Sequence, residues 1–160
     1  MKLRKGNQIE VIVFKKDEKE NYKFLLLKRI KSRGGFWQPI TGGIEGDESE
    51  EEAMKREIKE EIGVKNILNI IGNIYHFVLE ENGKEEFVFG VEISPKEKID
   101  LNKNIYQEHE DYKWCSFDEA LNLLKYQGNK DGLKKLYQKL KESTNPKVKQ
   151  EISKDMTFSE

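Results

Sequence analysis

The chain has almost no cysteine, no excess of either charge and no long hydrophobic run. Cys115 is its only cysteine, which excludes an internal disulfide and leaves no Cys/His spacing typical of a metal site. Lysine and arginine number 29 against 30 aspartates and glutamates, so the composition does not indicate a nucleic-acid-binding surface. The apolar runs are only as long as strands, far too short to span a membrane.

The N-terminal residues also lack an apolar segment. Residues 1–5 are basic, but residues 6–8 are Gly-Asn-Gln rather than the hydrophobic part of a secretory signal. We therefore expect a cytoplasmic protein without a membrane partner, present as a monomer or a homodimer. The length and the 36% hydrophobic content suit one domain, placed at residues 1–142, with residues 143–160 as a polar C-terminal tail.

Hydrophobic periodicity predicts an α/β fold with a mixed sheet between helices. Ser49 and Glu52 have the spacing of a capping box, and Gly63 stands where helices commonly end, so a helix is expected between them. Strand patterns occupy residues 10–14, 22–27, 67–78, 86–93 and 112–115, and further helical patterns occupy residues 116–124 and 130–142. The first two strands are expected to form a hairpin, and residues 95–107 a loop or short hairpin near the site.

The predicted helix after Ser49 concentrates acidic side chains on one side. At 100° per residue Glu57, Glu60 and Glu61 share one arc, directly beside the apolar stripe of the same helix. A solvated acidic surface is the common explanation for such a run. The position at the edge of the core argues instead for a bound counter-charge, because partly desolvated carboxylates are costly when uncompensated. Hard oxygen ligands of this kind suit Mg²⁺ or Mn²⁺.

A glycine-rich segment precedes this helix. Gly42 and Gly43 are expected to form a loop whose backbone can approach an anion closely, while the N-terminal end of the helix attracts phosphate. Divalent ions held by carboxylates beside such a loop are suited to the hydrolysis of a phosphoanhydride bond.

Residues 42–64 resemble the Nudix box, G-x5-E-x7-R-E-U-x-E-E-x-G-U, in which U is aliphatic. Every fixed position is filled, by Gly42, Glu48, Arg56, Glu57, Ile58, Glu60, Glu61, Gly63 and Val64. The resemblance implies a Nudix hydrolase with an α/β/α sandwich fold. It also implies that Glu57, Glu60 and Glu61 bind the metal, that the carbonyl of Thr41 is a further ligand, and that Glu48 and Arg56 form a pair that orients the acidic side chains.

A second segment, residues 108–114, has the pattern E-H-x-x-Y-K-W. It resembles the dihydroneopterin triphosphate and dATP pyrophosphohydrolase branch of the Nudix family, in which the matching glutamate approaches the metal. Glu108 is therefore the candidate general base and a candidate metal ligand, although some Nudix enzymes use a glutamate of the box as the base. For His109 both a phosphate contact and a structural role are open.

The lead-in to the box, residues 36–42 with the sequence F-W-Q-P-I-T-G, resembles the same branch. Phe36 and Trp37 are candidates for stacking on a base or pterin ring, with anchoring in the core as the alternative for at least one of them. Arg29 is a candidate phosphate contact, and Gly42 and Gly43 complete the expected substrate-binding set.

The expected activity is Mg²⁺-dependent, or Mn²⁺-dependent, release of pyrophosphate from a nucleoside or pterin triphosphate. Two enzymatic alternatives are a diadenosine polyphosphate or RNA 5′-end pyrophosphohydrolase and a MutT-like enzyme that removes oxidised nucleotides. A Nudix module that only senses a ligand would be expected to lose acids of the box, and all of them are present here.

Overall fold

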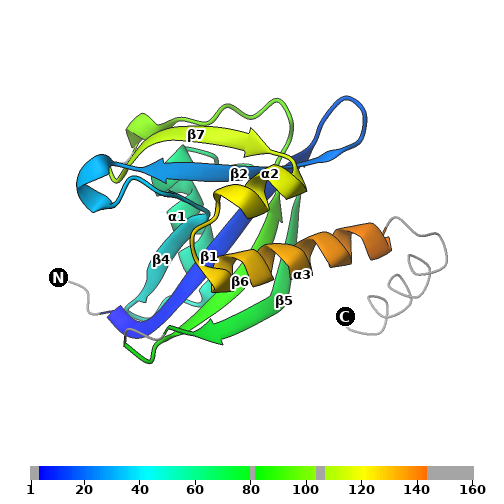
Figure 1. Ribbon diagram of the computed structural model, residues 1–160. Helices are drawn as coiled ribbons and strands as arrows, with labels where there is room; N and C mark the ends of the chain where they lie inside the picture. The colour runs from blue at the N-terminus through cyan, green and yellow to red at the C-terminus, as the bar shows by residue number, and fades with distance from the viewer. Residues whose placement is uncertain (1–3, 80–81, 104–106, 144–160) are drawn as a thin grey trace.

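The computed structural model describes residues 4–79, 82–103 and 107–143 (Figure 1). The strands are β1 (Arg4–Lys16), β2 (Tyr22–Arg29), β3 (Trp37–Gln38), β4 (Ile40–Glu45), β5 (Asn69–Val78), β6 (Glu85–Glu92) and β7 (His109–Cys115). The helices are α1 (Glu50–Ile62), α2 (Phe117–Leu123) and α3 (Gln127–Ser143), with short 3₁₀ turns η1 (Lys31–Arg33) and η2 (Leu101–Lys103).

All seven strands belong to one mixed sheet in which β1 is central. β1 pairs in antiparallel fashion with β2 and β4 and in parallel fashion with β6. β5 continues the sheet beyond β6, and β3 and β7 both pair with β2. The sheet thus brings the β2–β7 pair, far apart in the sequence, into the same layer as the strand that leads into α1.

Alternation along β1 divides the core between the two faces of this sheet. Ile9 and Val11 pack with α1, whereas Ile12 and Phe14 pack with α2 and α3. The helices therefore cover opposite faces, as Figure 1 shows, and the expected α/β/α sandwich is confirmed. Among the described residues, no helix combines the length and the apolar composition needed to cross a membrane.

Several local predictions are also confirmed. The first hairpin forms with Phe14 opposite Phe24. The capping box is present, because the Ser49 hydroxyl accepts from the Glu52 amide at 3.1 Å and the Glu52 carboxylate accepts from the Ser49 amide at 3.0 Å. Gly63 ends α1 with a φ of 71°, a conformation that glycine adopts without strain.

Other elements extend beyond their expected limits, and part of the chain lies outside the described residues. β1 starts at Arg4, β7 at His109 and α3 at Gln127, each earlier than its hydrophobic pattern predicted. Polar residues open these elements, so periodicity alone does not find their ends. The predicted tail falls almost wholly on residues 144–160, which are not described.

The predicted glycine loop is wrong. Gly42 and Gly43 lie inside β4, opposite Ile9 and Gln8 of β1. The turn into α1 instead uses Gly46, whose φ of 50° is in the left-handed region. The local glycine content suggested a loop, but pairing with β1 holds this segment as a strand.

A buried pair of glutamates, separate from the predicted site, lies on the face of the sheet covered by α3. Glu10 of β1 is fully buried, and Glu86 of the neighbouring strand β6 is 4% exposed. The amide of Asn129 on α3 donates to a carboxylate oxygen of Glu10. Burial, reinforced by the charge of Glu86, raises the pKa of Glu10 well above its ordinary value, and burial raises the pKa of Glu86 to about 7.

The raised pKa of Glu86 predicts a specific dependence of stability on pH. The folded protein binds the Glu86 proton more tightly than the unfolded chain does. The contribution of protonated Glu86 to the free energy of unfolding is therefore fully present below pH 4.5 and is lost as the pH rises through about 7. Replacing Glu86→Gln removes the titration. The variant should gain up to about 3 kcal/mol relative to wild type between pH 5 and pH 8.

Urea unfolding of both proteins at the two pH values measures this difference. The exposed Glu18→Gln is the matched control and should show no such change with pH. A constant difference between Glu86→Gln and wild type at pH 5 and pH 8 would contradict the assignment.

Candidate functional site

The guanidinium of Arg56 joins α1 to the two segments before it. Its Nε and Nη2 donate to the two oxygens of Glu48 at 2.7 and 3.1 Å, and Nη2 also donates to the Gly43 carbonyl at 2.8 Å. Nη1 donates to Glu57 Oε1 at 2.7 Å. Burial alone would lower the pKa of Arg56, but the bonds and charges of Glu48 and Glu57 raise it above its ordinary value. Arg56 is therefore a permanent cation that fixes β4, the turn and α1 together.

Glu57 lies between this guanidinium and the sheet. Its carboxylate packs on Gly42 so closely that a Cβ at position 42 would overlap Oε1 and Cδ and lie 2.8 Å from Cγ. Burial raises the pKa of Glu57 to about 7 even though the charge of Arg56 opposes the shift. A cation placed at this carboxylate would offset the desolvation of the charged form. The absence of a side chain at Gly42 therefore admits the Glu57 carboxylate against β4.

The three candidate metal-binding acids of α1 differ in exposure. Glu57 and Glu61 are 8% and 6% exposed, whereas the Glu60 side chain is 54% exposed and approaches Arg56 Nη1 at 3.4 Å. The predicted arc thus runs from the protein interior at Glu61 and Glu57 to the rim at Glu60.

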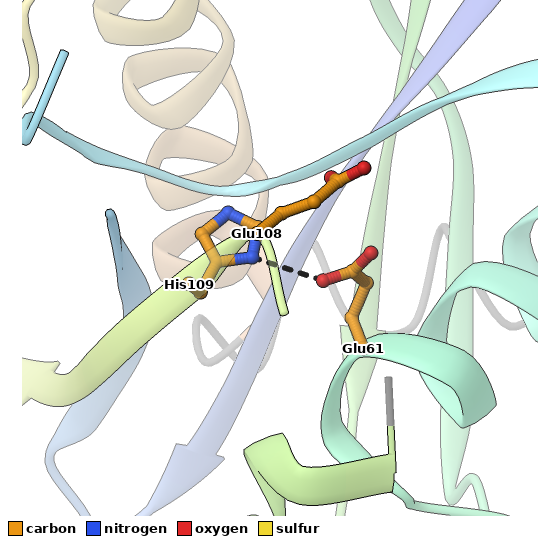
Figure 2. Close-up of side chains that lie close together, drawn as sticks. All are labelled: Glu61, Glu108 and His109. Atoms are coloured by element: carbon orange, nitrogen blue, oxygen red, sulfur yellow. Dashed lines mark hydrogen bonds and ion pairs between the residues drawn. The ribbon is translucent and has the colours of Figure 1, made fainter. Parts of the chain in front are cut away.

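Glu61 is joined to β7 through a buried histidine. His109 Nδ1 lies 2.9 Å from Glu61 Oε2, and His109 Nε2 lies 2.9 Å from Gln38 Nε2 of β3. In Figure 2 the Glu61 and Glu108 carboxylates lie on the same side of the imidazole, and candidate ligand atoms of Glu61, Glu108 and His109 all lie within 4.8 Å of one another. The structure therefore brings Glu108, predicted from a separate segment, to the acidic helix.

The backbone around Glu108 is held in place as well. Its carbonyl accepts from the Ile30 amide at 3.0 Å, and Arg29 pairs with His109 across β2 and β7. Gln107, directly before it, has a φ of 43°, a value that few residues other than glycine adopt. This bend turns the chain at the start of β7.

This arrangement fits a hard divalent cation. Its donors are carboxylate oxygens, two of the acids are buried, and one cation, Arg56, contacts four carboxylates: Glu45, Glu48, Glu57 and Glu60. Negative charge therefore exceeds positive charge, and oxygen donors of this kind are the ligands that Mg²⁺ and Mn²⁺ prefer. Thr41, the other candidate ligand, precedes Gly42 in β4 and pairs with Glu10 of β1.

Two of the candidate substrate-binding residues, Arg29 and Phe36, lie together at the end of β2. Arg29 lies with its Cζ 5.8 Å from the centre of the Phe36 ring, and its buried Nε has no hydrogen-bond partner in the described part of the chain. Phe36 also meets Tyr126 edge-to-face at 5.5 Å and lies 4.9 Å from Lys125 Nζ. Trp37 packs into the core beneath α2 and α3. Of the two predicted aromatic residues, Phe36 is thus the one placed in a cationic and aromatic environment.

A cavity of about 440 Å³ adjoins the acidic cluster. Its lining includes Ile30, Leu101, Gln107, His109 and Tyr112. Sequence reasoning missed Gln38, Lys125 and Tyr126. The available signal for Gln38 was an amide side chain within the mostly apolar segment of residues 36–40, whereas nothing local connected residues 125–126 with Phe36.

Known proteins resemble this chain in sequence and in fold. A family model described as the NUDIX domain matches residues 6–140. An octanoyltransferase of Myxococcus xanthus is 33% identical over 120 residues, which are 69% of this chain and 31% of that protein. The nucleoside triphosphatase NudI of Klebsiella pneumoniae (strain 342) is 30% identical over 112 residues, 62% of this chain and 77% of NudI. The chain thus spans about a third of the length of the first relative.

The solved structure of the E. coli dihydroneopterin triphosphate pyrophosphohydrolase superposes with a TM-score of 0.66. It is 23% identical and the match covers 81% of this chain and 93% of that chain. This likeness concerns the fold.

The contact between Gly42 and Glu57 predicts the effect of one added methyl group. Gly42→Ala should lower the free energy of unfolding by about 1–3 kcal/mol, because the Cβ displaces a carboxylate that Arg56 holds. Urea unfolding at pH 7 measures the loss. Gly72→Ala is the matched control, since its Cβ would lie 3.6 Å from Phe89 in ordinary contact, and it should stay within about 1 kcal/mol of wild type. Equal stability of the two variants would contradict the packing described.

Proposed function

This chain belongs to the Nudix family, and from that membership we propose that it is a divalent-metal-dependent hydrolase that releases pyrophosphate from nucleoside or pterin triphosphates. The observation that carries the proposal is the convergence of buried carboxylates from α1 with Glu108 at the start of β7. The relative NudI, a nucleoside triphosphatase by name, supports the nucleoside triphosphate class.

The proposed metal ligands are Glu57, Glu60, Glu61 and Glu108, together with the carbonyl of Thr41. Mg²⁺ is the proposed ion, with Mn²⁺ as its substitute, because the donors are all hard oxygens. When bound, the ion neutralises phosphate charge and lowers the pKa of a coordinated water. Side chains of the protein fix the position of these ligands. Arg56 orients Glu57 and is itself aligned by Glu48.

Glu108 is the proposed general base that accepts a proton from the attacking water. Its position supports this role, since its carboxylate lies beside that of Glu61 and its backbone is held by Ile30. Glu57 is the alternative base within the box, because its raised pKa of about 7 suits proton transfer near neutral pH.

The proposed substrate contacts are Arg29 for phosphate and Phe36 for the base or pterin ring. The buried Nε of Arg29, which has no hydrogen-bond partner among the described residues, supports the first, and the exposed Lys125 and Tyr126 beside Phe36 support the second. Trp37, Gly42 and Gly43 support the site from the sheet rather than from its surface. The nearly balanced charge of the chain disfavours an RNA substrate.

The proposal predicts that Glu61→Gln abolishes turnover. With Mg²⁺ and a panel of nucleoside triphosphates, dihydroneopterin triphosphate and dinucleoside polyphosphates, wild type should release pyrophosphate from at least one triphosphate. Glu61→Gln should lower kcat/KM more than about 100-fold, the upper end of the loss seen for an outer partner of a metal site. The exposed Glu51→Gln on the same helix, which contacts Lys55, should act like wild type. Full activity of Glu61→Gln would refute the proposal.

A second prediction concerns the base. Glu108→Gln should lower kcat about 10²–10⁴-fold and remove the acidic limb of the pH–rate profile, because no carboxylate remains at that position to accept the proton. Steady-state rates between pH 5 and pH 9 at saturating Mg²⁺ measure both effects, with Glu110→Gln as the neighbouring exposed control. An unchanged rate and profile would place the base elsewhere, with Glu57 next in order.

A further inference from the structure

We infer that Gln38 and His109 are positioning residues, and that the hydrogen-bond chain from the Gln38 amide through the His109 imidazole to Glu61 sets the direction in which Glu61 presents its carboxylate to the cation. The inference rests on the proposed function, because it concerns the same carboxylate site. It adds two residues that lie outside the Nudix box and are not among the proposed metal ligands.

The three side chains form a continuous buried chain across three elements. Gln38 of β3, His109 of β7 and Glu61 of α1 are 6%, 7% and 6% exposed, and both contacts measure 2.9 Å. Buried polar groups that are fully paired hold one arrangement, because any other leaves a donor or acceptor without a partner at a cost. These two hydrogen bonds therefore restrict the side-chain torsions of Glu61 as well as its position.

The polarity of the chain follows from its two ends. The amide nitrogen of Gln38 can only donate, so His109 Nε2 accepts, and the imidazole hydrogen is then on Nδ1. Nδ1–H then donates to Glu61 Oε2, because an ionised carboxylate can only accept. Gln38 thus selects the histidine tautomer that Glu61 requires, in the way that outer partners orient the ligands of metal sites.

This arrangement gives each buried acid of α1 its own donor. Arg56 holds Glu57 from within the helix. His109 holds Glu61 from the sheet, as Figure 2 shows. His109 also directly follows Glu108, so one backbone segment supplies both the donor to Glu61 and the second carboxylate of the cluster. The spacing between Glu61 and Glu108 is therefore fixed through His109.

Two other roles for His109 make different predictions. It could serve only to fill the core, in which case any apolar replacement of similar size preserves the site. It could also be a metal ligand itself, since its ring lies within 4.8 Å of both carboxylates. Because both ring nitrogens are already engaged by Gln38 and Glu61, the geometry favours a donor over a ligand.

The test compares His109→Asn, His109→Leu and Gln38→Leu in the full chain, without substrate. An asparagine places its amide nitrogen near the position of Nδ1 and keeps the donor to Glu61, whereas leucine removes it. Mn²⁺ affinity, measured by electron paramagnetic resonance of the free ion, should fall about 10–100-fold in His109→Leu. It should stay within roughly 3-fold of wild type in His109→Asn and fall between these values in Gln38→Leu. His76→Asn, at the exposed histidine of β5, is the control and should bind like wild type.

Several results would overturn the inference. One is wild-type Mn²⁺ affinity in both leucine variants; another is an equal loss in His109→Asn and His109→Leu. Gln38→Leu keeps the test valid if His109→Leu does not fold, and thermal unfolding of each variant separates lost stability from lost affinity. Glu61→Gln is the reference: if it binds Mn²⁺ as wild type does, or wild type binds none, the proposed metal site itself fails. If Glu61→Gln loses binding and both leucine variants keep it, only the positioning role fails.

Discussion

The partly buried guanidinium of Arg56 makes the contacts on which the rest of the site depends. It donates to Glu48 in the turn, to the Gly43 carbonyl in β4 and to Glu57 in α1, so one side chain fixes three successive segments. Partial removal of a charge from water is costly unless its donors are met with good geometry, and these contacts meet them. Without them the Glu57 carboxylate would have no compensation so close to the sheet.

The architecture then adds what the helix cannot provide. Glu61 is 48 residues away from His109 in the sequence, yet the β2–β7 pairing brings them to hydrogen-bond distance. The same strand start carries Glu108, so the acidic cluster joins a local helical motif to a distant sheet edge. The face covered by α3 has a separate buried pair, Glu10 and Glu86, which takes no part in this cluster. Because burial raises both pKa values, ionisation of this pair lowers the free energy of unfolding at high pH.

Sequence reasoning predicted the parts of the site that depend on local geometry. The capping box, Gly63 and the acidic arc follow from the 3.6-residue period of a helix, and the pairing of Glu48 with Arg56 follows from the box resemblance. The prediction for Gly42 and Gly43 was wrong because strand pairing with β1, a long-range interaction, overrides the local preference of glycine. Gln38 and the role of His109 were not predictable in the same way, since their contacts span three elements that only the folded sheet brings together.

The central claim is that Glu57, Glu61 and Glu108 form one cation site. It is tested most directly by a crystal structure of the full chain grown with Mn²⁺, in which the anomalous signal locates the ion. The account predicts an anomalous peak within direct coordination distance of carboxylate oxygens from both α1 and Glu108. A peak elsewhere on the protein, or none at these carboxylates at millimolar Mn²⁺, would contradict it.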